Sequence, residues 1–139
     1  MKKHTMIAAV IAAVFVSAGG YSQTILQNHV CTTDMAKSNY IMALRSENEG
    51  LEESSLMQSA KVRILYPDVN FQEVKQVVDS LAVNGNTPTL RYEAYLASNV
   101  LENPSWFAKW DRQAMQDPDT FFVSVAAQLQ ERIFGSRTN

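Results

Sequence analysis

Few side chains in this sequence are of the types that catalyse reactions or hold metal ions at neutral pH. Histidine is the commonest acid, base and metal ligand in that range, and it occurs only at His4 and His29. His4 lies in an N-terminal leader that we expect to be cleaved. His29 and the single cysteine, Cys31, lie two residues apart in a segment without helical periodicity, which would not hold them as a catalytic pair. We therefore expect no enzyme, no catalytic residues, no metal site and no cofactor.

The densest group of charges is acidic and comprises Glu47, Glu49, Glu52 and Glu53. A calcium-binding loop needs a glycine at its sixth position and oxygen ligands at alternate positions. Gly50 as the sixth residue would make an arginine the first ligand, which excludes that loop. Negative charge at the start of a helix stabilises the helix dipole. We expect this role for the four glutamates.

An aromatic group occupies the stretch between the fourth and fifth expected helices. Trp106 and Trp110 are four residues apart, so on a helix they would share one face, with Phe107 beside them. Such rings often anchor a protein partner, and we take these three as the candidate partner-binding residues. The alternative is that they close the end of the helical stack. Residues 105–116 form either a connection or a short sixth helix.

The charge of the chain argues against nucleic acid as a partner. The formal net charge is −2, and it becomes more negative once the two lysines of the leader are removed. The basic residues are scattered singly. Nucleic-acid binding needs a basic face that neutralises phosphates, so we exclude that class.

The first 22 residues have the pattern of a cleavable signal peptide. A short basic start precedes an apolar run at residues 6–18, which is shorter than the ~20 residues of a membrane-spanning helix. Gly20 and Ser22 suit the −3 and −1 positions of a cleavage site after Ser22, although cleavage after Ala18 or Gly20 stays open. Cys31 lies too far downstream for a lipoprotein signal. We expect a periplasmic or secreted protein without stable membrane insertion after cleavage, the alternative being an uncleaved anchor.

The remainder predicts an all-α fold, with a tail at residues 23–32 and one helical domain at residues 33–135. Apolar residues recur at three- and four-residue spacing throughout, and no stretch alternates with period two for long. Five amphipathic helices are expected, at about 34–45 and 51–66, between Asn70 and Gly85, between Thr87 and Asn103, and between Asp117 and Gly135.

The ends of these helices carry recognisable signals. Thr87-Pro88 and Asp117-Pro118 each place a capping residue before a proline at the first helical position. Asn48 is a candidate cap for the second helix, together with Ser46. Asn70–Glu73 resembles a capping box, and Gly85 suits a left-handed helix stop.

The second and fourth expected helices align with an offset of 37 residues. The offset pairs Met57 with Ala94, Ala60 with Ala97, Ile64 with Leu101, and Pro67 with Pro104. Units of this length that contain two helices are typical of HEAT-like repeats. Over about residues 48–134 the chain resembles small exported proteins of unknown function with HEAT-like helical hairpins. The residues that carry the resemblance are Glu49-Gly50-Leu51, Asn86-Thr87-Pro88, Arg91-Tyr92 and Leu101-Glu102-Asn103-Pro104.

The resemblance implies antiparallel hairpins and a capacity to bind, with no activity attached. The hairpins would form either a short HEAT-like stack or an irregular bundle. We expect a non-catalytic protein–protein interaction module of the cell envelope, whose partner is another envelope protein. The alternatives are a small ligand-binding protein or enzyme with a pocket between the hairpins, and a purely structural envelope protein. The oligomeric state and the pairing of Cys31 with another molecule stay open.

Overall fold

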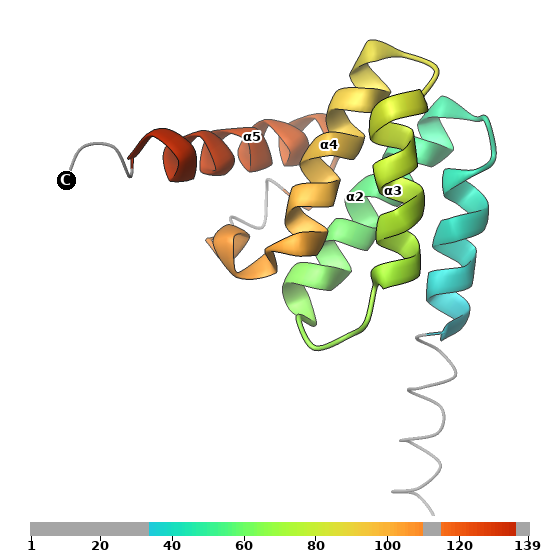
Figure 1. Ribbon diagram of the computed structural model, residues 1–139, viewed down its shortest axis with the longest axis horizontal. Helices are drawn as coiled ribbons and strands as arrows, with labels where there is room; N and C mark the ends of the chain where they lie inside the picture. Colours follow the sequence, from blue (N-terminus) through green and yellow to red (C-terminus); the bar gives the residue numbers. More distant parts are fainter. Residues whose placement is uncertain (1–33, 110–114, 136–139) are drawn as a thin grey trace, which may run out of the picture. The chain divides into compact units, whose positions relative to one another are not determined.

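The computed structural model describes residues 34–109 and 115–135, and every regular element in these two ranges is helical. The prediction of an all-α fold is therefore confirmed. The expected signal peptide and tail lie outside the described residues, as do His29, Cys31 and Trp110. The elements are a first helix at 34–44, α2 (Glu49–Leu65), α3 (Gln72–Asn84), α4 (Pro88–Glu102), the 3-10 helix η1 (Pro104–Phe107) and α5 (Pro118–Gly135) (Figure 1).

The described residues from 37 onward form one compact unit, and α4 is the element that organises its core. This helix packs against α2, α3, α5 and η1. Its inner face combines Leu90, Val100 and Leu101 with the small Ala94 and Ala97, all buried. The spacing of these residues keeps them on one side of the helix, and the alanines leave room for neighbouring helices to approach.

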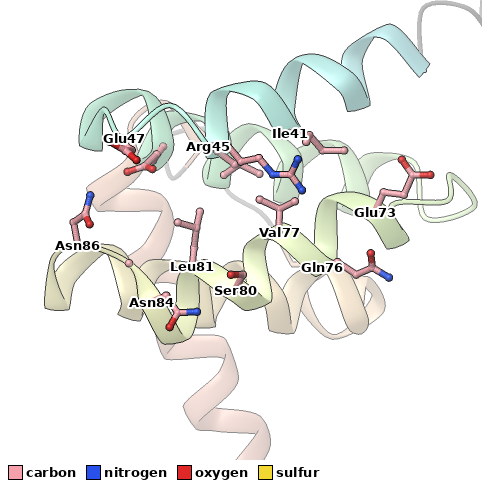
Figure 2. Close-up of a pocket in the computed structure, with 13 residues that line it drawn as sticks. Ile41, Arg45, Glu47, Glu73, Gln76, Val77, Ser80, Leu81, Asn84 and Asn86 are labelled. Carbon is pink, nitrogen blue, oxygen red and sulfur yellow. The ribbon is translucent and has the colours of Figure 1, made fainter.

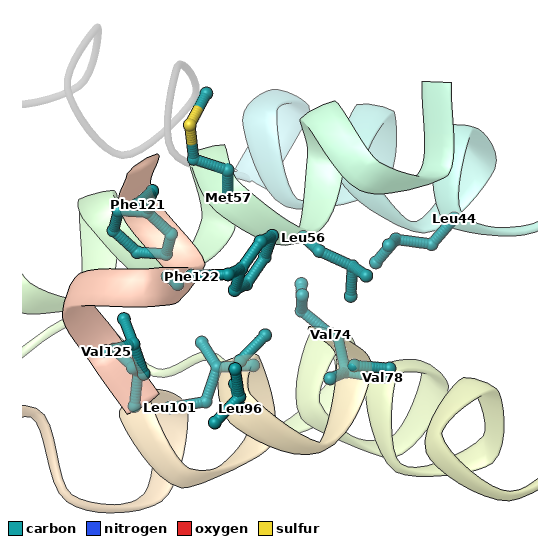
Figure 3. Packing of buried hydrophobic residues seen from close by; sticks show 14 of the residues in the cluster. Leu44, Leu56, Met57, Val74, Val78, Leu96, Leu101, Phe121, Phe122 and Val125 are labelled. Atoms are coloured by element: carbon teal, nitrogen blue, oxygen red, sulfur yellow. The ribbon is translucent and has the colours of Figure 1, made fainter. Parts of the chain in front are cut away.

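The rest of the core comes from side chains of the other helices that point into the same interior. Figure 3 shows Leu56 of α2, Val74 and Val78 of α3, and Phe122 and Val125 of α5 turned toward one another. Each such burial contributes roughly 1.5–3 kcal/mol for a Val, Leu or Phe side chain.

The expected caps of three helices are confirmed. The Asn48 side chain accepts a hydrogen bond from the backbone N–H of Leu51 at 3.1 Å, so α2 begins at Glu49, two residues before its expected start. The Thr87 hydroxyl accepts from Leu90 N–H at 3.1 Å at the start of α4. Asp117 Oδ1 accepts from Thr120 N–H at 2.9 Å at the start of α5. Each bond satisfies a backbone donor that has no partner within its helix.

The two ends of α3 differ from expectation. Phe71 rather than Asn70 occupies the N-cap position, and it makes no side-chain capping bond. Asn70 Oδ1 instead accepts from Gln72 N–H at 2.9 Å. Gly85 follows the helix with φ −57°, which is not left-handed.

Glycine is needed at position 85 because of a close approach. A Cβ atom there would lie 2.7 Å from the carbonyl oxygen of Leu81. The Gly85 carbonyl also accepts a hydrogen bond from the Arg91 guanidinium at 2.7 Å, which ties the α3–α4 connection to α4.

Polar side chains of α2 and α3 also bind the C-terminal end of α4. Arg63 Nε donates to the Leu101 carbonyl at 3.2 Å, and its Nη1 donates to the Pro67 and Val69 carbonyls, so that α2, the following loop and the end of α4 are joined. Lys75 Nζ lies 2.8 Å from Asp79 Oδ2 within α3 and 3.2 Å from Glu102 Oε2 at the end of α4.

Among the described residues, no helix has the length and apolar character needed to cross a membrane.

Candidate functional site

A groove of about 640 Å³ lies beside the first helix and α3 (Figure 2). We call it the Glu52 groove, after the one residue that α2 contributes. Its apolar lining consists of Ile41 and Leu44 from the first helix and Val77 and Leu81 from α3. Its charged lining is Arg45, Glu47, Glu52 and Glu73, and Gln76, Ser80, Asn84, Gly85 and Asn86 complete it.

Glu52 is the most unusual member of this lining because its side chain is almost entirely buried, with 3% exposed. Its Oε2 atom has no hydrogen-bond partner among the described residues. The residue lies in the first turn of α2, where the helix dipole favours a negative charge. The dipole does not replace a direct donor, because leaving a buried acceptor unsatisfied costs about 1–3 kcal/mol, and more when the acceptor is charged.

Two exposed residues of the turn before α2 lie on the rim of the groove. The Arg45 guanidinium points across the groove in Figure 2, and within the described ranges it makes no ion pair or side-chain hydrogen bond. Glu47 has φ 57°, in the left-handed region that a residue with a side chain seldom adopts. This backbone conformation turns the chain from the first helix into α2.

A second group of carboxyls surrounds Glu93 on the inner part of α4. Glu93 is 5% exposed, and its Oε2 also has no partner among the described residues. Burial, together with the negative charges of Glu53, Asp119 and Glu49, raises the pKa of Glu93 to about 7. The pKa of Glu53 is raised as well, first by burial and then by Glu49 and Asp119. Glu49 accepts a hydrogen bond from the Thr87 hydroxyl at 2.6 Å.

These acidic groups do not form a metal centre. Across residues 34–109 and 115–135, no group of three or more His, Cys, Asp or Glu side chains is arranged to hold a metal ion. Burial of Glu93 and the acids around it instead give a carboxyl with a pKa of about 7. Glu93 does not line the Glu52 groove.

The three predicted partner-binding residues have different surroundings. Phe107 is fully buried and belongs to the core, so it presents no surface to a partner. The Trp106 ring is 40% exposed, and the guanidinium carbon of Arg132 lies 5.5 Å from its centre. A groove of about 450 Å³ adjoins this ring and is also lined by Lys109, Gln128, Glu131 and Arg132. Trp110 lies outside the described residues.

Sequence reasoning identified neither buried glutamate as special. The sequence pattern places Glu52 with its acidic neighbours at a helix start and does not distinguish Glu93 from other glutamates. A signal for both was present in the spacing. Glu52 lies four residues before Leu56, and Glu93 lies three after Leu90 and four before Ala97, so each falls on the apolar face of its helix. This spacing on an apolar helix face does not identify Arg45, because the groove that Arg45 borders is formed by segments distant in sequence.

The resemblance to exported proteins with HEAT-like hairpins stays a prediction. Its residues Glu49 to Leu51 form the first turn of α2, which Asn48 caps, and Asn86 to Pro88 lead into α4, where Thr87 provides the cap. Capping residues report on helix position and carry no chemistry of their own. Comparisons of the chain with protein-family models, with curated proteins and with solved structures found no match.

Proposed function

We propose that this protein is a non-catalytic interaction module of the cell envelope, which binds a protein partner through the surface around Trp106. We define the Trp106 surface by Trp106 of η1, by Lys109, which follows η1, and by Gln128, Glu131 and Arg132 of α5. The proposal includes export by cleavage of the leader, which its basic start and apolar run favour. It also includes HEAT-like antiparallel hairpins, which the 37-residue offset between α2 and α4 favours.

The observation that carries the proposal is the half-exposed ring of Trp106 held next to Arg132. An Arg guanidinium 5.5 Å from the centre of an indole ring has the distance of a cation–π contact, which restricts both side chains. Tryptophan and arginine are the residues most enriched at the energetic centres of protein interfaces. A pair that is ordered before binding loses less conformational freedom when a partner arrives.

The support beneath the ring makes this surface more rigid than an ordinary loop. Phe107, the next residue, is fully buried in the core. Trp106 N–H donates to the Asn103 carbonyl at 3.0 Å, which fixes the first turn of η1. The adjoining groove of about 450 Å³ has polar and charged walls, as the rim of an interface does.

The test is a crosslinking capture with the mature protein in its native envelope fraction. Trp106→Ala removes the ring, and Tyr92→Ala is the matched control because Tyr92 is an exposed aromatic residue of α4 outside this surface. Circular dichroism first checks that both variants are folded. We expect one envelope protein to be captured by the wild type and by Tyr92→Ala, with binding by Trp106→Ala weaker by about 30-fold, the effect of losing a strong interface residue.

Two results would contradict the proposal. If Trp106→Ala captures the same partner as well as the wild type does, the contact surface lies elsewhere. If no protein is captured by either, the chain is not an interaction module under the conditions of its own compartment. Arg132→Lys refines a positive result, since it keeps the charge but loses the planar group that stacks on the ring.

A further inference from the structure

We propose that the Glu52 groove binds a small organic cation, namely a primary ammonium group carried on a compact apolar body. The inference goes beyond the proposed interaction with a protein partner. It concerns a separate part of the molecule, since the Glu52 groove and the Trp106 surface share no residue.

Glu52 presents an unsatisfied carboxylate oxygen at the groove. A side chain with 3% exposure has little access to water, and its Oε2 has no donor among the described residues. A ligand with N–H donors would supply the missing hydrogen bond, and a positive charge would strengthen it. An ammonium group provides three donors in a compact volume, which suits a buried carboxyl that other groups do not reach.

The charged side chains that line the groove are mostly acidic. Three carboxyl side chains, of Glu47, Glu52 and Glu73, line it together with one guanidinium, that of Arg45. The excess of acidic groups favours a cation over an anion. The Arg45 side chain extends over the groove in Figure 2 and is exposed, so water screens its charge more strongly than that of buried Glu52.

One wall of the groove is apolar. Leu44 and Val77 are buried core residues that also line the groove, and Ile41 and Leu81 pack against the same core. This surface would be covered by the hydrocarbon part of a ligand while its ammonium group meets Glu52. The volume of about 640 Å³ lies within the range of small-molecule sites, roughly 300–1,000 Å³.

A metal ion fits the groove less well than an organic cation does. The carboxyls of the described residues are not arranged as a set of metal ligands. An apolar wall also adds nothing to the binding of a bare ion, whereas it contributes to the binding of an amine with a hydrocarbon body.

The experiment titrates the mature protein with 2-phenylethylamine, which is protonated at neutral pH, and follows amide chemical shifts by NMR. The control ligand is 3-phenylpropionate, which has a similar body and the opposite charge. We expect saturable shifts for groove residues with the amine and none with the carboxylate. No saturable shift with the amine up to about 10 mM, or equal binding of the two ligands, would overturn the proposal.

Two variants assign the role of Glu52. Glu52→Gln keeps the shape of the side chain and removes its charge, and we expect it to weaken amine binding by about tenfold or more, as the loss of a charged hydrogen bond implies. Glu73→Gln is the matched control at an exposed carboxyl of the same groove, and we expect an effect below about threefold because water screens that charge. Equal affinities of Glu52→Gln and the wild type would contradict the assignment.

A third variant covers the case in which Glu52→Gln does not fold. Ser80→Trp leaves Glu52 unchanged and places a large ring in the groove from an exposed position of α3. We expect it to fold and to lose amine binding, and unchanged binding would show that the amine sits elsewhere. Trp106→Ala should retain full amine binding, so failure of this proposal is distinguishable from failure of the proposed interaction surface.

Discussion

The two buried glutamates of this protein differ in what surrounds them. Glu52 lines an open groove near a single guanidinium, whereas Glu93 faces three other acids from α2 and α5. Both have an oxygen without a partner among the described residues. Burial, and then repulsion by the acids around it, raises the pKa of Glu93 to about 7, so the protonation of this carboxyl couples to folding near neutral pH.

The raised pKa of Glu93 predicts a stability that falls as the pH rises. The ordinary value of 4.5 applies to the unfolded chain and about 7 to the folded one, so the folded state holds the proton more tightly between these values. Ionising buried Glu93 lowers the free energy of unfolding. This loss is absent at about pH 4, grows between about pH 4.5 and 7, and reaches up to about 3 kcal/mol at higher pH. Glu93→Gln is neutral at every pH and avoids this cost.

The measurement is urea unfolding of the wild type and Glu93→Gln at both ends of that pH range. We expect Glu93→Gln to be more stable than the wild type above about pH 7 and to have nearly the same free energy of unfolding at about pH 4. Glu73→Gln serves as the control, because its exposed side chain carries no burial cost. A difference between Glu93→Gln and the wild type that does not change with pH would show that the burial of charge is not its cause.

At the scale of elements, the start of α4 links local capping to a contact between helices. The Thr87 hydroxyl accepts a hydrogen bond from Leu90 N–H and donates one to Glu49 Oε1, 38 residues earlier in the chain. Glu49 lies in the first turn of α2. One hydroxyl therefore holds the starts of two helices together.

We expect Thr87→Ala to lower the free energy of unfolding by about 1 kcal/mol, within the usual range for the loss of an N-cap. Thr87→Ser keeps the hydroxyl and should stay close to the wild type. Chemical denaturation monitored by circular dichroism measures both. If the serine variant is as unstable as the alanine variant, the methyl group of Thr87 and not its hydroxyl is responsible.

The helix ends differ in how well the local sequence predicts them. Asn48, Thr87 and Asp117 cap the helices that they were expected to cap, because each bond forms between residues three apart. The end of α3 was expected to be left-handed at Gly85, and it is not. There the requirement for glycine comes from the Leu81 carbonyl and from the side chains of Leu90 and Arg91, which approach it as α4 folds back.

At the scale of the whole molecule, the proposed export makes a prediction about its N-terminus. We expect the protein recovered from the periplasm or medium to begin at Gln23, which intact-mass measurement and N-terminal sequencing would show. Ala12→Arg places a charge in the apolar run and should prevent export, since that run must be apolar to be recognised. An exported protein that retains Met1 would contradict cleavage, and a start after Ala18 or Gly20 would move the site.

The sequence by itself determined the class of the fold and the places of its helices. Apolar periodicity, capping residues and prolines act within a few residues of one another, so they can be identified along the chain. The all-α class and the starts of α2, α4 and α5 followed from these local rules. Glu49 and Glu52 were also correctly placed in the first turn of a helix, whereas Glu47 lies in the turn before it, and nothing in the order of the glutamates showed that Glu52 is buried.

Only the tertiary structure decided which side chains are buried and what they meet. Phe107 lies in the core while Trp106, its neighbour, is half-exposed, although both are large aromatic residues on one turn. Glu93 meets acids from α2 and α5, and the Glu52 groove joins residues of the first helix, α2 and α3. These outcomes depend on how helices pack across long separations in sequence, because burial and charge interactions are set by distance in space.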